Sequence, residues 1–211
     1  MRDETKAPRQ AAIEDAAAEL FAEKGFQGTS MLAIAKRAKA SNETLYRWYG
    51  DKVGLFRALV ERNAAEVRTR LEADLTEDRS AAKALRDLGP TLLSLLLSER
   101  AIALNRAAAA DISGALGAAL TEAGRGSVAP LIARLMLRGR AEGWLTFEDP
   151  AEAVALYLSL LVGDLQIRRA IGALPEPDAR DINERAARAF AQFCRLAGPI
   201  TDGDADRRIV E

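Results

Sequence analysis

The stretch "ASNETLYRWYGDK", residues 40–52, gathers hydrogen-bonding and aromatic side chains between two apolar runs. Ser41 is placed to cap a short helix over 42–49, which Gly50 ends. Another short helix, over 31–38, precedes it by only a few residues. Two short helices that follow a longer one have the layout of a helix-turn-helix, whose second helix enters the DNA major groove. The stretch therefore predicts a DNA-reading element.

Charge supports a local contact with nucleic acid. The chain holds 30 Lys and Arg residues against 31 Asp and Glu residues, so its net charge is −1. Residues 24–52 alone carry six cations and two anions, which is a net charge of +4. The chain as a whole is not a polycation, and any nucleic-acid role must be confined to this segment.

Composition excludes several other classes of function. The 211 residues contain no histidine, which removes the commonest general base and the commonest metal ligand. The single cysteine, Cys194, excludes an intramolecular disulfide and a CxxC site. The start "MRDETKAPRQ" has no apolar signal region, and no apolar run reaches membrane-spanning length. We expect a cytoplasmic protein with no catalytic residues, no metal site and no cofactor.

Helical periodicity runs through the whole chain, and no segment shows strand alternation, so the fold class is all-α. A first helix follows Pro8 and ends at Gly25, and a fourth begins after Asp51. Further helices are expected at about 79–97, 100–111, 113–123, 126–141, 150–172 and 178–197. These predict a helix-turn-helix domain over 1–53, a larger effector-binding and dimerisation domain over 54–198 joined through the fourth helix, and a mobile tail over 199–211.

The side chains near the start of the helix over 42–49 suit DNA chemistry. Those that can donate to phosphates are Ser41, Asn42, Thr44 and Tyr46. Asn42 can also read a base edge, and Trp48 and Tyr46 offer apolar faces to sugars or thymine methyl groups. Lys52 falls in the first turn of the next helix, where free amides attract a phosphate. As packing aromatics, Tyr46 and Trp48 would compete with Leu45 and Tyr49, which already fill the inward face.

Residues 8–60 resemble the N-terminal domain of tetracycline-repressor (TetR) family transcription regulators. The matching text is "AAAELFAEKGFQGTSMLAIAKRA" (16–38) followed by "SNETLYRWYGDKVGLFRAL" (41–59). The resemblance implies an all-helical homodimer that binds double-stranded operator DNA and whose C-terminal domain binds a small effector. It also implies, position by position, the DNA-facing residues Ser30, Met31, Asn42, Glu43, Thr44, Tyr46, Arg47, Trp48 and Lys52.

Two positions depart from the family pattern. The family's turn usually carries glycine where this chain has Lys39, so the turn must adopt a less permissive backbone geometry or a different one. Position 43 is often small in the family and is glutamate here. Glu43 either accepts a hydrogen bond from cytosine or only complements the dipole of its helix from the side.

Apolar stripes over 150–172 and 178–197 predict the dimer interface, a four-helix bundle formed with a twofold copy. Polar residues within apolar helices either line an effector cavity or lie on exposed and interface faces; they are Asn105, Arg106, Asp111, Trp144, Tyr157, Asp164 and Gln166.

The favoured interpretation is a repressor that a small, mostly apolar effector releases from its operator. A DNA-binding protein without a ligand switch and a small helical enzyme are the alternatives.

Overall fold

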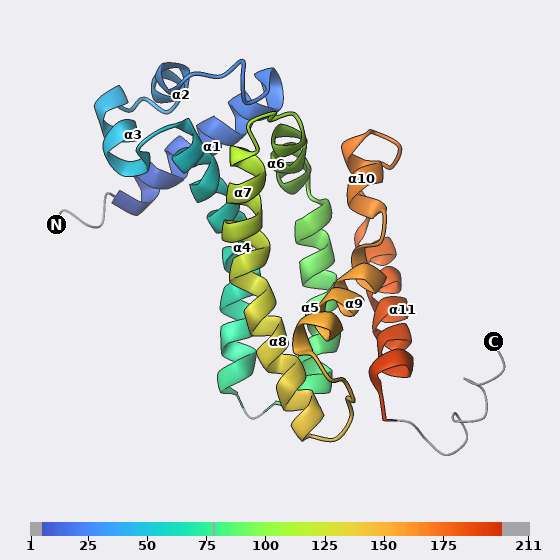
Figure 1. Cartoon of the computed structure of the whole chain (residues 1–211). Helices are drawn as coiled ribbons and strands as arrows, with labels where there is room; N and C mark the ends of the chain where they lie inside the picture. The colour runs from blue at the N-terminus through green and yellow to red at the C-terminus, as the bar shows by residue number, and fades with distance from the viewer. Residues whose placement is uncertain (1–5, 78, 200–211) are drawn as a thin grey trace. The chain divides into compact units, whose positions relative to one another are not determined.

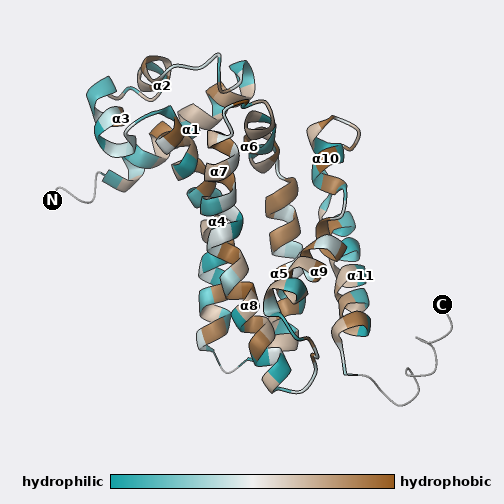
Figure 2. Cartoon of the chain, in the orientation of Figure 1, coloured by the Kyte–Doolittle hydropathy of each residue, from teal (hydrophilic) through white to brown (hydrophobic). Residues whose placement is uncertain are grey.

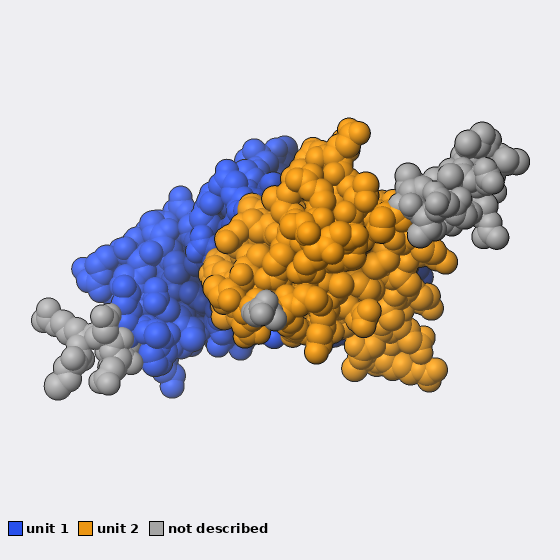
Figure 3. Space-filling view, turned by 90° about the horizontal axis from the view of Figure 1, so that it is seen from below, with its two compact units in different colours: residues 1–66, 95–127, 167–176 blue, residues 67–94, 128–166, 177–211 orange. Residues whose placement is uncertain are grey.

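The computed structural model of the chain describes residues 6–77 and 79–199, and within these ranges it contains helices and no strand (Figure 1). The expected all-α class is confirmed. The described residues form two compact units (Figure 3). Of the described residues, unit 1 comprises 6–66, 95–127 and 167–176, and unit 2 comprises 67–77, 79–94, 128–166 and 177–199.

Unit 1 begins with three helices that share one core. They are α1 (Lys6–Lys24), α2 (Met31–Arg37) and α3 (Asn42–Tyr49). The N-terminal part of α4 (Lys52–Thr76), α6 (Glu99–Ala109), α7 (Ala115–Leu120), a π-helical turn (Thr121–Arg125) and most of α10 (Leu165–Ala170) complete the unit. Ile13, Ile34, Leu45 and Phe56 are fully buried in this core, as the periodic apolar stripes predict.

A buried cation, Arg169 of α10, holds part of unit 1 together. Its guanidinium is 5% exposed, donates to the carbonyl of Leu97 at 3.1 Å and pairs with Glu99 at 2.7 Å. Because a buried charge is costly without partners, these contacts fix α10 beside the start of α6.

Unit 2 is built on the contact of α9 (Pro150–Val162) with α11 (Ala179–Ala197), together with α5 (Ala81–Leu97) and α8 (Gly126–Ala141). Figure 2 shows α5 as predominantly hydrophobic. At Gly89 of α5 an added Cβ would lie 3.2 Å from both Ala186 and the hydroxyl of Tyr157, so a larger residue would require these neighbours to shift by a few tenths of an ångström. The Tyr157 hydroxyl donates to the carbonyl of Leu85 at 3.1 Å.

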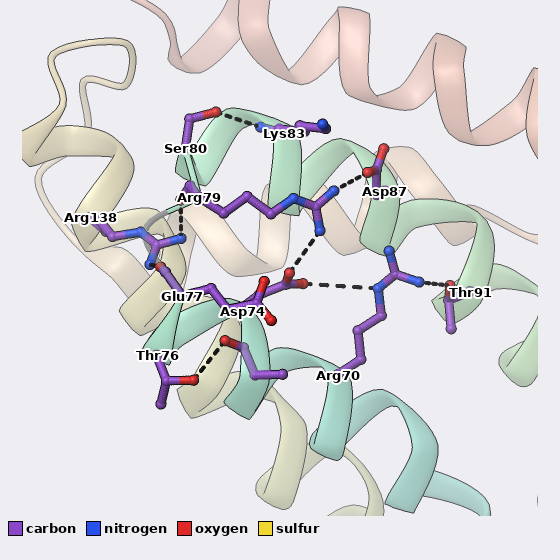
Figure 4. A network of polar contacts seen from close by, with 11 residues as sticks. Arg70, Asp74, Thr76, Glu77, Arg79, Ser80, Lys83, Asp87, Thr91 and Arg138 are labelled. Atoms are coloured by element: carbon purple, nitrogen blue, oxygen red, sulfur yellow. Dashed lines mark hydrogen bonds and ion pairs between the residues drawn. The ribbon is translucent and has the colours of Figure 1, made fainter.

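The C-terminal end of α4 is tied into unit 2 by a polar network (Figure 4). Asp74, which is 4% exposed, accepts a hydrogen bond from Arg79 at 2.8 Å, and Arg79 also pairs with Asp87. Arg138 of α8 donates to the carbonyl of Arg79 at 2.7 Å. These contacts join α4, the loop that follows it, α5 and α8. Nothing in the hydrophobic pattern predicts this network.

Two expectations about the C-terminal helices need correction. The helix expected over 150–172 is two helices, because Gly163 leaves helical geometry at φ 52° and Arg185 donates to the carbonyls of Leu160 and Leu161 that would otherwise continue α9. Leu161 and Phe190, on the stripes expected to face a second copy, are 0% and 9% exposed within the single chain. Helix α5 supplies the covering layer that the sequence did not reveal.

The expected domain boundary at residue 53 stays a prediction. Helix α4 is continuous through that position, and its residues divide between the two compact units after Glu66. Of the expected tail, 199–211, all residues after Pro199 lie outside the described ranges.

Candidate DNA-binding interface

The two short helices begin and end where the sequence predicts. Ser30 caps α2 by accepting a hydrogen bond from the Ala33 amide at 3.1 Å, and Ser41 caps α3 by accepting one from the Thr44 amide at 3.0 Å. At Gly54 an added Cβ would lie 1.9 Å from the carbonyl oxygen of Tyr49, so glycine lets the first turn of α4 contact the end of α3.

The turn between α2 and α3 has Lys39 at the position where the family usually carries glycine. The Lys39 backbone adopts a positive φ of 51°, and among the described residues Lys39 is the only non-glycine that does so. The amide of Ala40 donates to the carbonyl of Ala35 at 2.9 Å, and the amide of Lys39 donates to that of Lys36 at 3.3 Å. This is the Schellman arrangement that usually places glycine at the left-handed position. The turn therefore keeps the family's left-handed geometry, with lysine in place of glycine.

The side chains of α3 divide into exposed and half-buried groups. Glu43, Tyr46 and Arg47 are exposed, with Tyr46 at 49%. Asn42, Thr44 and Trp48 are half-buried, and Trp48 packs against the core of unit 1. These six residues lie around the fully buried Leu45, which fixes the helix from its inner side.

Met31 does not fit the expected DNA-facing role. Its side chain is 6% exposed and belongs to the core, because it lies on the inward stripe of α2 with Ile34 and Ala35. The family resemblance implied that Met31 faces DNA, whereas the helical periodicity of α2 places its side chain inside. Ser30, immediately before Met31, is exposed.

The Lys52 ammonium is oriented toward the protein. It donates to the carbonyl oxygens of Phe26 and Thr29 at 2.7 and 2.8 Å and lies 4.2 Å from the centroid of the Phe26 ring. Burial lowers the pKa of this amine below its ordinary value. Lys52 thus fixes the loop between α1 and α2, and Asp51 accepts a hydrogen bond from the Gly54 amide at the start of α4. The phosphate contact of Lys52 stays a prediction.

Ion pairs reduce the number of cations available to DNA. Arg37 pairs with Glu19 at 3.0 Å and with Glu23 at 3.1 Å. Lys36, Lys39 and Arg47 are exposed and form no ion pair within the described residues. These three side chains are the positive charges that the turn and α3 present.

A polar seam that the sequence does not predict anchors the three-helix element to the rest of unit 1. Glu14 of α1 accepts a hydrogen bond from Tyr49 at 3.2 Å and pairs with Arg62 of α4 at 3.3 Å. Asp15 pairs at 2.9 Å with both Arg62 and Arg100 of α6. Burial raises the pKa of Glu14, and the opposing attraction of Arg62 lowers it by less. The pairing spans distant helices, so spacing along the chain gives no signal for it.

Within the described ranges, no three His, Cys, Asp or Glu side chains come together as a group that could bind a metal ion. None of the helices in these ranges combines the length and the apolar character that a membrane span needs.

A three-helix element with an exposed, partly cationic second short helix defines a helix-turn-helix DNA-binding protein. Comparison with known proteins gives the family. Residues 13–59 match the model of bacterial regulatory proteins of the tetR family, and residues 83–197 match the C-terminal domain of AefR-like transcriptional repressors. The chain belongs to the TetR family of transcriptional regulators. Members of this family bind operator DNA and small-molecule effectors and act as dimers.

Solved structures of relatives share the fold over nearly the whole chain. A TetR-family regulator from Mesorhizobium loti MAFF303099 is 26% identical with a TM-score of 0.76, covering 92% of this chain and 99% of that one. A TetR regulator from Agrobacterium tumefaciens is 32% identical with a TM-score of 0.71, covering 90% and 95%.

A fatty acid metabolism regulator protein from Bacillus subtilis (strain 168) is 28% identical over 99 residues, 47% of this chain. The match spans about half of that relative, 51% of its length.

Proposed function

We propose that the chain is a repressor that reads its operator with the exposed face of α3. The observation that carries this is the pairing of a rigidly capped α3 with three exposed cations, Lys36, Lys39 and Arg47, that no carboxylate of the described residues neutralises. The residues proposed to contact DNA are Ser30, Asn42, Glu43, Thr44, Tyr46, Arg47, Trp48 and Lys52. Met31 is left out because its side chain is in the core.

Selection of bound duplexes from a random pool, followed by salt titration of the selected site, tests this function. Neutralising one phosphate contributes a slope of about −0.9 to the logarithm of affinity against the logarithm of salt concentration. Arg47→Ala should remove roughly one such unit. Lys83→Ala removes an exposed cation from α5 in unit 2 and should leave the slope unchanged. A pool that yields no enriched sequence would rule out sequence-specific binding.

Asn42 is proposed to discriminate between bases. Its side-chain amide can bond a base edge, and its Oδ1 accepts no hydrogen bond within the described part of the chain. Asn42→Ala should cost about 1–3 kcal/mol at one or two positions of the site and little elsewhere. A uniform loss on all sequences would assign Asn42 to the phosphates.

The dimer is proposed to form through the outer faces of α9 and α11. Helix α9 is apolar nearly all round, yet Leu158 remains half-buried, and Leu196 of α11 is 53% exposed. An apolar face of this kind is stabilised when a twofold copy covers it. Leu196→Glu should shift sedimentation toward monomer, whereas Leu137→Glu on α8, also exposed, should not. A dimer unaffected by Leu196→Glu would place the interface elsewhere.

The repressor is proposed to release its operator when a small, mostly apolar effector binds among the helices of residues 79–171. The apolar character of α5 and the name of the Bacillus subtilis relative, a fatty acid metabolism regulator, support an apolar ligand. Helix α4 starts at Lys52, next to the helix-turn-helix, and ends in the polar network of Asp74. A movement of α4 would therefore change the distance between the α3 helices of the two protomers, which must match the spacing of the operator half-sites.

Linkage tests the switch, because operator DNA must weaken effector binding by the same factor by which the effector weakens operator binding. Equal effector affinity with and without operator would favour the alternative, a DNA-binding protein without a switch. We propose no catalytic activity and no cofactor for the chain, and a cytoplasmic location, where bacterial DNA is accessible.

A further inference from the structure

A pocket of about 630 Å³ lies within unit 1, between the C-terminal half of α1, the loop over 25–28 and α6. Its volume falls in the range of small-molecule sites. The DNA-reading face of α3 contributes no residue to it.

Part of the lining of this pocket is apolar, and α6 contributes small residues to it. Ala103 and Ala107 of α6 line it together with Phe21 of α1 and Leu59 of α4. Larger side chains at the two alanines would fill it. The cavity therefore depends on the small side chains of Ala103 and Ala107.

The polar lining carries an excess of positive charge. Glu99 pairs with Arg169, and Arg100 pairs with Asp15, so these two charges are compensated. Lys24 and Arg106 also line the pocket and form no ion pair within the described residues. Arg106 is held in place by hydrogen bonds to the carbonyls of Ala170 at 2.7 Å and Arg169 at 3.0 Å, which leave its charge uncompensated.

We propose that this pocket binds a small amphipathic anion, with its apolar body between Phe21 and the alanines of α6 and its anionic group near Lys24 and Arg106, and that the bound anion lowers operator affinity. Only the second half of the proposal rests on the proposed repressor function. An apolar lining with a few convergent charges is the chemistry that such a ligand requires.

The loop beneath the pocket connects it to the reading helices. The Phe26 ring lies 5.2 Å from that of Phe21 and 5.9 Å from that of Phe56, and its carbonyl accepts a hydrogen bond from Lys52 at 2.7 Å. The loop leads directly to Ser30, the cap of α2. A ligand that displaces Phe26 would move the start of α2 and weaken the hydrogen bonds from Lys52 to the loop carbonyls.

Octanoate is a suitable probe of the pocket. The controls are 1-octanol and octylammonium, which have the same chain length with a neutral and a cationic head group. Amide chemical shifts of the full-length protein, recorded during each titration without DNA, should change in residues 18–28 and 103–110. Octanoate should bind most tightly. Lys24→Gln should weaken octanoate about two- to fivefold and leave octanol unchanged.

Ala107→Trp should fill the pocket and weaken octanoate more than about tenfold, since the apolar body loses its space. Ala109→Trp, on the exposed face of the same helix, is the matched control and should bind as the original protein does. Ala103→Leu is a smaller filling that keeps the test valid if the tryptophan variant does not fold. Binding that survives both fillings, or shifts confined to other residues, would overturn the site.

Operator affinity is measured in parallel on the selected duplex. Octanoate should lower it for the original protein and the Ala109→Trp control, and should not do so for Ala107→Trp. Binding in the pocket with unchanged operator affinity would overturn the coupling. Failure to select any operator would refute the repressor function and leave the binding result, obtained without DNA, to decide the site.

Discussion

Replacing Lys39 by glycine should stabilise the protein. A non-glycine residue in the left-handed region costs about 1–2 kcal/mol, and Lys39 is held there at φ 51° by the Schellman hydrogen bonds that end α2. Glycine removes this cost but loses more backbone freedom on folding, which costs about 0.5–1 kcal/mol. Taken at the middle of both ranges, the net gain in the free energy of unfolding is about 0.75 kcal/mol. For a chain of this size it corresponds to a rise in Tm of about 1–4 °C.

The control is Lys39→Ala, which removes the same cation and keeps the strained backbone. Urea unfolding followed by circular dichroism, at one protein concentration because the family is dimeric, should place the midpoints in the order glycine above alanine. Both variants should lose operator affinity to the same extent, since both lose one charge. A glycine variant no more stable than the alanine variant would show that the turn is unstrained or relaxes at no cost.

Three further perturbations test contacts that the structure adds. Lys52→Met should lower the free energy of unfolding by about 1–3 kcal/mol, because two partly buried carbonyl oxygens, those of Phe26 and Thr29, lose their donor. An unchanged urea midpoint would contradict this. Asp74→Asn should destabilise by a similar amount, since the hydrogen bond from Arg79 loses its charged acceptor, and the same measurement checks it. Burial raises the pKa of Glu14, so the folded state binds more protons than the unfolded state above about pH 4.5. The free energy of unfolding of the original protein, relative to that of Glu14→Gln, should therefore fall as pH rises above about 4.5. A difference between the two proteins that does not change with pH would refute the raised pKa of Glu14.

The sequence by itself determined the all-helical class and the reading element. Ser30 and Ser41 cap their helices in the structure because a side-chain oxygen beside a free amide is a local interaction, fixed by spacing along the chain. The inward stripe of Leu45 and the break at Gly50 follow from helical periodicity and from the conformational freedom of glycine. The departure of Lys39 from the family pattern was also visible in the sequence, and its left-handed backbone is the consequence.

Only the tertiary structure decided which polar side chains bond to distant segments and which helix covers a given apolar stripe. Lys52 donates to a loop more than twenty residues away, Glu14 joins α1 to α3 and α4, and Leu161 is covered by α5 of its own chain. Leu161 shows the limit most clearly: periodicity identifies its apolar stripe, but the helix that covers the stripe, α5, is set by how distant helices pack. Contacts between residues far apart in sequence depend on that packing, because no local spacing records them.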